Sequence, residues 1–591
     1  MLEFRLVSRS ASGTPSQLLT LADLEPAAFT GEIVRSASAE FAPPGSGVIG
    51  PIVTFEINRA DASAFGQFTG SNVNRQMAIV LDDNIITAPT LQARISEQGQ
   101  ITGIGSLEEA ADIALVLRSG ALPISLHVEE IRQIGPTLGQ DSIDAGLRAG
   151  LVGAALVVAS ILLYYGPLFG GVLAFGLGLA MLFVFGILAG LGAALTMPGL
   201  AGLVLTLGAA IDGNVISFER IKEELSNGKS LRLSMKTGFT NSLSAIIDAN
   251  ITTLLAAGAL YQYTSGPVRG FATTLAIGVV AALFVNLVIV PFILNVLTQR
   301  IRKPRIPSRF VVPGFKFVRF APLVTAIAGV LVVTSVLGVS FQGLSMSTDF
   351  TGGTSVLYRV PAETTVADVR TALDQLDLEG TSGGGANIVE VQDPTVEGSL
   401  ISVRTAVGGS AEASDQLSTG LATALNAEVL SVDFVGPAVG ADLRQGAIMA
   451  VLVALGLILF YIGFRFWPNW PVAVATVVGA AHDALIVLGL VWIAGLEFSI
   501  PVMAAILFVV GYSLNDSIII SDRIRENLKS VRGYRYAELV DLSINQTLTR
   551  TVMTSVTTLL PVLALLVFGG AVLTGFSLVI FVGIAIGTGT D

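Results

Sequence analysis

The sequence predicts a polytopic α-helical membrane protein that carries two α+β domains outside the membrane, and three observations support this class. Of the 591 residues, 52% are hydrophobic and only 13% are charged, which is too apolar for a soluble chain of this length. Apolar segments long enough to cross a bilayer recur in two groups. Two long polar stretches, residues 1–142 and 343–440, each precede a group of such segments.

Composition also excludes several classes of function. The chain has no cysteine and only two histidines, so a disulfide framework, a thiol nucleophile and a His/Cys metal site are not expected. The net charge is −11, and the acidic residues are concentrated in the two polar stretches. Nucleic acid is therefore not an expected partner.

Residues 1–142 are predicted to form the first α+β domain. Strands are expected over 51–58 and 76–88, and a helix within 106–120, with Ser106 as its N-cap and Gly120 just past its end. No basic region followed by an apolar core precedes this domain. Because the charge distribution places the domain outside the cell, we expect that a preceding transmembrane helix and the early part of the domain are missing from this chain.

Residues 143–298 are predicted to form the first membrane bundle, with five spans. A basic linker, 299–320, follows, and the positive-inside rule places it in the cytoplasm. Residues 321–342 form a sixth apolar segment. The five spans of the bundle are expected near residues 145–165, 168–191, 198–218, 244–262 and 271–298.

Residues 343–440 alternate predicted strands and helices in the order βαββαβ, which is the ferredoxin-like arrangement. By orientation this second domain also lies outside the membrane. Residues 441–591 then form a second bundle of five spans, which brings the expected total to eleven. These last spans are expected near residues 446–465, 471–494, 499–520, 551–568 and 573–589.

The two bundles resemble each other as an internal repeat. GAAIDGNVISFERI, residues 208–221, aligns with GYSLNDSIIISDRI, residues 511–524, so that Asp212 falls against Asn515 and Gly213 against Asp516. The halves have the same orientation, which indicates a parallel repeat about an axis along the membrane normal. The working site is then expected where the two halves meet.

The strongest candidate residues are charges inside apolar segments. Asp516 lies within such a segment and Arg550 opens the next, so the two should face each other on antiparallel helices. Burying an ionisable group at this depth costs at least ~2.5–3.5 kcal/mol, which makes a functional role the first hypothesis. Arg550 close to Asp516 favours the ionised acid, and Arg550 displaced lets the acid bind a proton. Asp212 is a second candidate station, and a purely structural ion pair is the alternative.

Four further polar residues within apolar segments are weaker candidates. His482 and Asp483 are a possible proton relay, but His482 also fits a core histidine bonded to a backbone carbonyl. Asp248 and Asn250 are interpreted as a further possible relay, as helix caps or as lining of a water cavity.

Together, the motifs of the chain resemble the SecD and SecF family of bacterial protein-export membrane proteins, in the fused SecDF form. The resemblance rests on LEFRLV, AIVLDDNIITAP, GAAIDGNVISFERIKEEL, SGPVRGFATTLAIG, STDFTGGTSV, AHDALIVLG, GYSLNDSIIISDRIREN and NQTLTRTVMTS. It implies a member of the RND superfamily with twelve spans and two outer domains. The proton-path residues of the family map onto Asp212, Asp516 and Arg550, and the DFTGG motif with Asp349, Gly352 and Gly353 is expected to shape a turn where the chain leaves the membrane.

The resemblance also implies a function. The family assists the Sec translocon channel in exporting unfolded polypeptides, in the bacterial cytoplasmic membrane, with both large domains extracytoplasmic. Accessory insertion factors and membrane lipid are further expected partners. We expect an ion-gradient-coupled translocation factor and not an enzyme, with no cofactor, and the sequence leaves open whether protons or sodium ions are used.

Three other functions are alternatives: an exporter of small molecules or lipids, an intramembrane protease and a passive scaffold. An RND-type exporter of small molecules or lipids is disfavoured by the small outer domains and by the DFTGG motif. An intramembrane aspartyl protease built on Asp212 and Asp516 lacks YD and GxGD signatures, and Arg550 fits a shared-proton dyad poorly. A passive scaffold for the translocon stays open.

Overall fold

The computed structural model divides into two compact units, Met1–His127 and Val128–Asp591, which are described separately. The residues described are 2–590 except 12, 16–17, 44–49, 82–83, 120–127, 301–311, 362, 377–385, 392–398, 406–410, 469 and 531–532.

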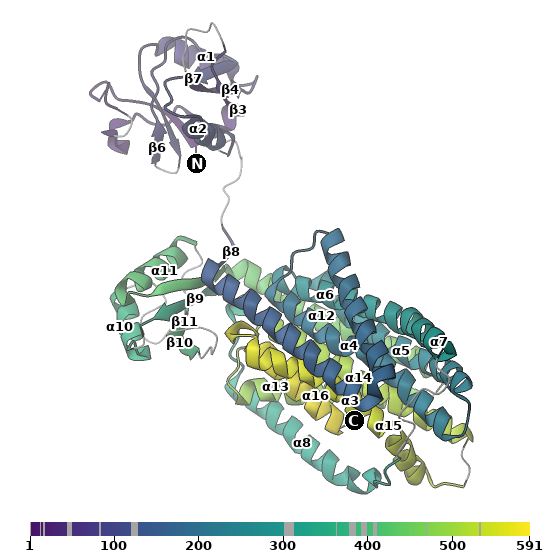
Figure 1. The fold of residues 1–591 in the computed structure, drawn as a ribbon. Helices are drawn as coiled ribbons and strands as arrows, with labels where there is room; N and C mark the ends of the chain where they lie inside the picture. Colours follow the sequence, from purple (N-terminus) through teal and green to yellow (C-terminus); the bar gives the residue numbers. More distant parts are fainter. Residues whose placement is uncertain are drawn as a thin grey trace. The chain divides into compact units, whose positions relative to one another are not determined.

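The first unit contains two antiparallel sheets and two helices (Figure 1). The four-stranded sheet has the order β2-β1-β5-β6 and the three-stranded sheet the order β3-β4-β7. Between them lies an apolar core that includes Phe4, Phe55 and Phe65. The elements are β1 Leu2–Leu6, β2 Phe29–Thr30, β3 Val34–Phe41, β4 Pro51–Ile57, α1 Ala62–Ser71, β5 Met77–Leu81, β6 Asn84–Thr87, β7 Gln98–Ile101 and α2 Leu107–Ser119, with 3-10 turns at Leu21–Asp23 and Gly31–Ile33.

The capping prediction for α2 is confirmed. Ser106 Oγ accepts a hydrogen bond of 3.1 Å from the backbone N–H of Glu109, which is the N-cap geometry. Glu109 in turn accepts from the backbone N–H of Gly105 at 3.0 Å. Gly120, which was expected just past the helix end, lies outside the described residues.

The boundary of the first domain differs from the predicted position at residue 142. Residues 128–142 belong to the second unit. In this segment β8, Glu130–Ile134, pairs antiparallel with β12, and α3 then begins at Pro136. The reason is non-local, because β12 offers an unpaired edge that a short strand can extend.

The second α+β domain, Gly353–Val435, has the predicted ferredoxin-like fold. Its strands lie in the order β10-β11-β9-β12, with β8 added as a fifth strand beside β12. Tyr358, Val369 and Leu417 are among the fully buried residues of the core between the sheet and its two helices. The elements are β9 Gly353–Val360, α10 Val366–Leu376, β10 Ala386–Val391, β11 Ser399–Thr405, α11 Ala411–Leu425 and β12 Glu428–Val435.

Within the described residues, ten helices are long and apolar enough to cross a membrane. The first of them, α3, contains two of the eleven predicted spans. Its helical path breaks at Gly166, where φ is 74°, and Pro167 follows. Gly170 then packs against the backbone of Ile161 and Leu162, because a Cβ at Gly170 would lie 2.7 Å from the carbonyl oxygen of Ile161. The chain therefore reverses direction within α3, at Gly166.

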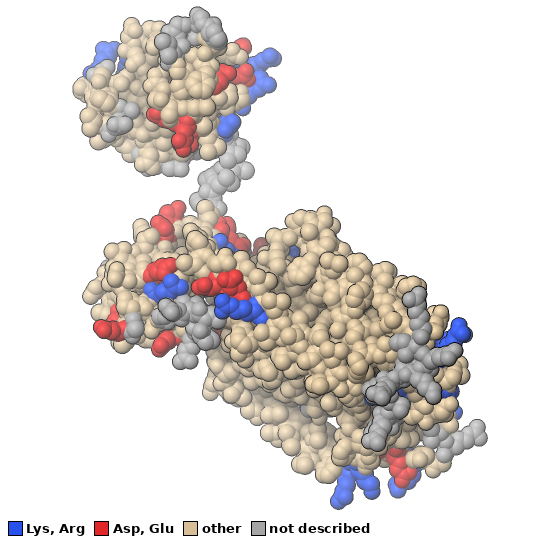
Figure 2. Space-filling model, viewed as in Figure 1, with Lys and Arg blue, Asp and Glu red and all other residues tan. Residues whose placement is uncertain are grey.

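The predicted sixth span corresponds to α8, and half of the predicted basic linker, residues 301–311, lies outside the described residues. Figure 2 shows a broad face of this bundle without Lys, Arg, Asp or Glu, as expected for a surface in contact with lipid. The helices of the second unit are α3 Pro136–Gly190, α4 Met197–Ser226, α5 Leu231–Tyr263, α6 Gly266–Phe284, a π-helical segment Val285–Ile289, α7 Val290–Arg300, α8 Phe317–Gln342, α9 Thr348–Thr351, α12 Pro437–Arg465, α13 Trp470–Ile493, α14 Ile500–Ser530, α15 Tyr536–Phe568 and α16 Ala571–Thr590.

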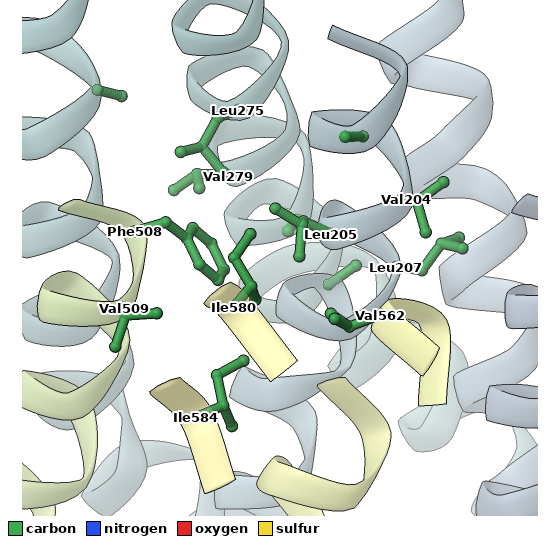
Figure 3. Close-up of a cluster of buried hydrophobic side chains, with 14 of the residues drawn as sticks. Val204, Leu205, Leu207, Leu275, Val279, Phe508, Val509, Val562, Ile580 and Ile584 are labelled. Atoms are coloured by element: carbon green, nitrogen blue, oxygen red, sulfur yellow. The ribbon is translucent and has the colours of Figure 1, made fainter. Parts of the chain in front are cut away.

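Two helices form the centre of the bundle. In the most apolar stretch of each helix, 83% of α4 and 78% of α14 is buried, whereas only 11% of α8 is buried. Helix α4 packs against α6 of its own half and against α15 of the other half. Helix α14 packs in the equivalent way, against α16 of its own half and against α5 of the other. This exchange is the packing that a parallel repeat requires. Figure 3 shows the apolar part of the centre, with Leu205 of α4, Phe508 of α14 and Ile580 of α16 among the buried side chains.

Candidate functional site

The three principal candidate residues, Asp212, Asp516 and Arg550, belong to one electrostatic cluster. They lie on α4, α14 and α15 respectively, and Asp516 is only 2% exposed. Both acids act electrostatically on the Arg550 guanidinium, and Asp212 has the larger effect. The sequence paired Arg550 with Asp516 on consecutive helices and made Asp212 a second station. The structure adds Asp212 to the same group.

The two halves of the repeat meet directly at this cluster. Asn515 Nδ2 donates a hydrogen bond of 2.5 Å to Asp212 Oδ2, and these are the two residues that the repeat alignment sets against each other. Residues equivalent in a duplication contact each other only when they lie next to the axis that relates the halves. Asp212 and Asn515 therefore mark that axis.

Several polar atoms of the cluster are buried without a hydrogen-bond partner among the described residues. They are Asp212 Oδ1, Asn515 Oδ1 and the Nε and Nη2 of Arg550. A buried polar group left unsatisfied costs about 1–3 kcal/mol, and more when it is charged. Such a cluster is suited to take up a proton or a cation at its carboxylate and amide oxygens, and water at the arginine donors.

Two cavities adjoin the cluster. One, of about 80 Å³, is lined by Arg550 together with Gln546, Thr547 and the charged C-terminal turns of α4 and α14. The other, of about 30 Å³, is lined by Asp212, Asn250 and Asn515 together with apolar residues of the neighbouring helices. Since a cavity of 10–15 Å³ of this kind holds about one water, both are large enough for water. Arg550 and Asp212 thus line separate cavities.

A π-helical segment lies close to Asp212. Asn214 Nδ2 donates 2.6 Å to the Oδ1 of Asn286, which lies within Val285–Ile289. A Cβ on Gly213 would lie 2.8 Å from Asn286 Nδ2, so only glycine at this position allows the approach. The duplication therefore cannot carry an acid at Gly213, the position that aligns with Asp516, without displacing Asn286.

His482 and Asp483 contact each other and α14. The Nδ1 of His482 lies 2.9 Å from Asp483 Oδ1, and Ser513 Oγ donates 2.6 Å to Asp483 Oδ2. Asp483 is fully buried. Ser513 and Asp516 are three residues apart, so they lie on one face of α14. The possible relay is therefore connected to α14, the helix that carries Asp516.

Asp248 and Asn250 are not helix caps, because α5 runs from Leu231 to Tyr263 and both lie in its interior. Asp248 Oδ1 accepts 2.6 Å from the hydroxyl of Tyr461, and its Oδ2 accepts 2.6 Å from Arg465 Nε. Both partners are on α12, so Asp248 joins the two halves. Asn250 bonds back to its own helix and lines the 30 Å³ cavity, as the cavity-lining interpretation expected.

The DFTGG motif forms the expected turn. Gly352 and Gly353 have φ values of 72° and 116°, which disfavour any residue with a Cβ. A Cβ on Gly352 would lie 3.2 Å from the carbonyl oxygen of Val435. Asp349 Oδ1 accepts 2.9 Å from Arg132 Nη2, which ties β8 to the base of the domain. The motif thus connects the sheet to the membrane bundle.

Sequence analysis did not single out Asn214 and Asn286 as site residues, and it considered Asn515 only as an aligned position. Each is an amide inside an apolar segment. Burial of an uncharged amide costs less than burial of a charge, so the sequence signal is weaker.

The fold and the buried charges define a duplicated, polytopic membrane protein of the transporter type, and comparison with known proteins assigns its family. The family model described as "Protein export membrane protein SecD/SecF, C-terminal" matches residues 119–300 and 416–590. The SecDF P1 head subdomain model matches residues 8–124.

Full-length relatives agree with the family models. The chain is 48% identical to protein translocase subunit SecDF of Thermus thermophilus, covering 100% of this chain and 81% of that protein. It is 33% identical to SecDF of Brucella abortus, covering 91% and 70%. The crystal structure of the Thermus SecDF, described as a translocon-associated membrane protein, matches with a TM-score of 0.78 at 47% identity, covering 100% of this chain and 82% of that one. A crystal structure of SecDF in a super-membrane-facing form gives 0.64 at 48% identity over the same shares. The chain belongs to the SecDF family of protein translocase subunits.

Proposed function

We propose that this protein uses a transmembrane ion gradient to drive or complete the export of unfolded polypeptides through the Sec translocon. It would act in the bacterial cytoplasmic membrane, with both large domains on the outer side and the charged turns of α4 and α14 on the inner side. It would do so as a coupling factor and not as an enzyme, and without a cofactor. Family membership supports the export function, and the burial of Asp212, Asp516 and Arg550 where the halves meet supports the coupling.

The observation that carries the coupling is that buried polar atoms of Asp212, Asn515 and Arg550 have no hydrogen-bond partner among the described residues and lie beside two cavities large enough for water. Arg550 faces one cavity and Asp212 the other. An ion arriving at one of the acids weakens its attraction to Arg550, which is then held by the other acid. Because Asp212 and Asp516 lie on different halves, such an exchange favours a different relative position of the halves.

The energy available is sufficient for a domain motion. Each elementary charge that crosses the membrane supplies ~2.3 kcal/mol per 100 mV. A few ions per cycle therefore supply several kcal/mol. The second outer domain receives the motion through α9 and α12, which pack so closely that a Cβ added to Gly440 of α12 would lie 3.0 Å from the backbone nitrogen of Gly352, the residue that follows α9.

Proton coupling is the form we propose, with sodium as the outcome that the test distinguishes. His482 and Asp483 would act as a relay toward α14 through Ser513. Asp248 would act as a clamp between halves, since its two oxygens bond to α12.

The test is the gradient-dependent completion of translocation in inverted membrane vesicles, with a proton or a sodium gradient imposed separately. Asp516→Asn should reduce the rate to that without a gradient while the protein still assembles. The matched control is Asp374→Asn, since Asp374 is exposed on α10. Unchanged export in Asp516→Asn at normal assembly would leave only a passive scaffold for the translocon.

A further inference from the structure

Four charged residues form a closed ring of ion pairs between the two halves. Arg220 lies 2.8 Å from Glu223 on its own helix and 2.5 Å from Glu526 on α14. Arg523 lies 3.1 Å from Glu526 on its own helix and is also paired with Glu223 on α4. Each residue of this ring therefore contacts two oppositely charged partners, one within its helix and one across the interface.

The ring follows the internal repeat. Its residues come from ERIKEEL, 219–225, and DRIRENL, 522–528, which continue the aligned segments of α4 and α14. Two further pairs repeat in the same way, Glu219 with Lys222 at 3.1 Å and Asp522 with Arg525 at 2.5 Å. Helices α4 and α14 both extend through these residues, and the ion pairs join the two helices.

The ring lies at the mouth of the cavity that leads to Arg550. All four residues line that cavity together with Arg550. The Glu526 side chain is 48% exposed, those of Arg220 and Glu223 are 18% and 19% exposed, and that of Arg523 is 8% exposed. The Nε and Nη2 of Arg550 are buried. Exposure thus decreases from Glu526 toward Arg550, which identifies the ring as the outer end of the cavity.

The pattern of pairs allows the ring to open without leaving a charge unpaired. The pairs Arg220–Glu223 and Arg523–Glu526 are spaced i, i+3 within one helix, so they persist when the helices separate. Only the two cross pairs, Arg220–Glu526 and Arg523–Glu223, break. Because each of the four charges keeps its i, i+3 partner when the cross pairs break, no charge is left without a counter-charge, and the two cross pairs can break and re-form within a working cycle.

We propose that Arg220, Glu223, Arg523 and Glu526 form a gate that holds α4 and α14 together and closes the Arg550 cavity to water and ions. They are positioning residues for the transport cycle, and the inference rests on the proposed function in taking Arg550 as part of the ion path. A purely structural ion-pair network predicts no link between the ring and access to Arg550.

The test measures access to the cavity by cysteine modification. The chain contains no cysteine, so Thr547→Cys, at a position that lines the cavity, supplies a single thiol. A membrane-impermeant, positively charged thiol reagent is added to inverted vesicles that carry the protein, with and without an ion gradient. The modification rate with the intact ring is compared with that in Arg220→Gln/Arg523→Gln.

Removing both arginines eliminates all four ion pairs, of which the two cross pairs hold α4 and α14 together. The modification rate should rise about five- to twentyfold, because each lost cross pair contributes up to a factor of about five. The rate should also lose its dependence on the gradient. A fourfold charge reversal, Arg220→Glu, Glu223→Arg, Arg523→Glu and Glu526→Arg, preserves every pair and should restore the slow, gradient-dependent rate. Equal rates in all three proteins, or a reversed ring that behaves like the glutamine variant, overturn the proposal.

A control thiol reports loosening of the fold. Ser335→Cys lies on α8, where Ser335 contacts Gly489 of α13 and is 6% exposed, and it should stay unreactive in every variant. If the glutamine variant makes this thiol reactive, Glu526→Gln replaces it, since it removes one cross pair at the most exposed member of the ring. The rate at Thr547→Cys is measured without translocation. A failure of Asp516→Asn to affect export therefore refutes the proposed function and leaves the gate intact, and the reverse also holds.

Discussion

Asp433→Asn should stabilise the ferredoxin-like domain, Gly353–Val435, at alkaline pH. Asp433 lies on β12 opposite Arg132 of β8 and Ser355 of β9. Burial raises the pKa of its carboxyl from the ordinary 3.8 to about 6, with Arg132 opposing the change and the charges of Asp349 and Glu130 adding to it. The arginine beside it therefore does not offset the cost of ionising Asp433 within the folded domain.

The sign and the size of the effect follow from proton binding. Between pH 3.8 and about 6 the folded protein holds a proton on Asp433 that the unfolded chain has released. The free energy of unfolding therefore falls as pH rises through this range, by about 3 kcal/mol for a pKa difference of about 2. Because Asp433 keeps partial contact with solvent, we expect about 1–3 kcal/mol. Asparagine has nearly the same size and cannot ionise, so the variant should be more stable than wild type above pH 6 and equal to it near pH 4.

The measurement is pulse proteolysis of the protein in detergent across a urea series, at pH 5, 6, 7 and 8. As the pH rises from 5 to 8, the urea midpoint of the ferredoxin-like domain should fall in the wild-type protein relative to Asp433→Asn. Asp374→Asn, on the exposed face of α10, is the control and should follow wild type. A variant that is less stable than wild type at pH 8, or a difference that does not change with pH, would refute the assignment of a raised pKa.

Two predictions concern the membrane bundle. Arg465→Met removes the charged partner of Asp248, which is 4% exposed, and should destabilise the protein by about 3 kcal/mol, whereas adding Asp248→Asn should recover part of this loss in a thermal-unfolding series. Gly278→Ala should cost about 1–3 kcal/mol, because its Cβ would lie 2.0 Å from Thr206 Cγ2 and force α6 away from α4. Gly171→Ala, with open space around it, should leave the melting temperature within error, and Thr206→Ser should rescue Gly278→Ala.

Local chemistry explains what the sequence could predict. The lengths of the apolar segments indicated the spans, and alternation of strands and helices indicated the ferredoxin-like domain. Ser106 indicated the start of α2, and the paired glycines of DFTGG indicated a turn. In each case the signal lies within a few residues and depends on the hydrophobic effect, on capping or on backbone sterics.

Contacts between distant segments required the tertiary structure. The sequence placed residues 128–142 in the first domain, but β12 recruits β8 from nearly three hundred residues away, and only the folded sheet shows its free edge. Likewise, α4 continues to Ser226 and α14 to Ser530, and ion pairs between the two helices join these ends, which the composition of either segment alone does not reveal.

By itself, the sequence determined which residues are charged inside apolar segments and that the two halves derive from one repeat. It placed Asp212 beside Asn515 only as an alignment. The tertiary structure decided that these two residues form a hydrogen bond and that both acids act electrostatically on Arg550. It also decided that four charged residues form a ring of ion pairs that lines the same cavity as Arg550. The physical reason is that the apolar pattern fixes which helices enter the membrane, while their rotation and relative height are set by packing around the axis that relates the halves.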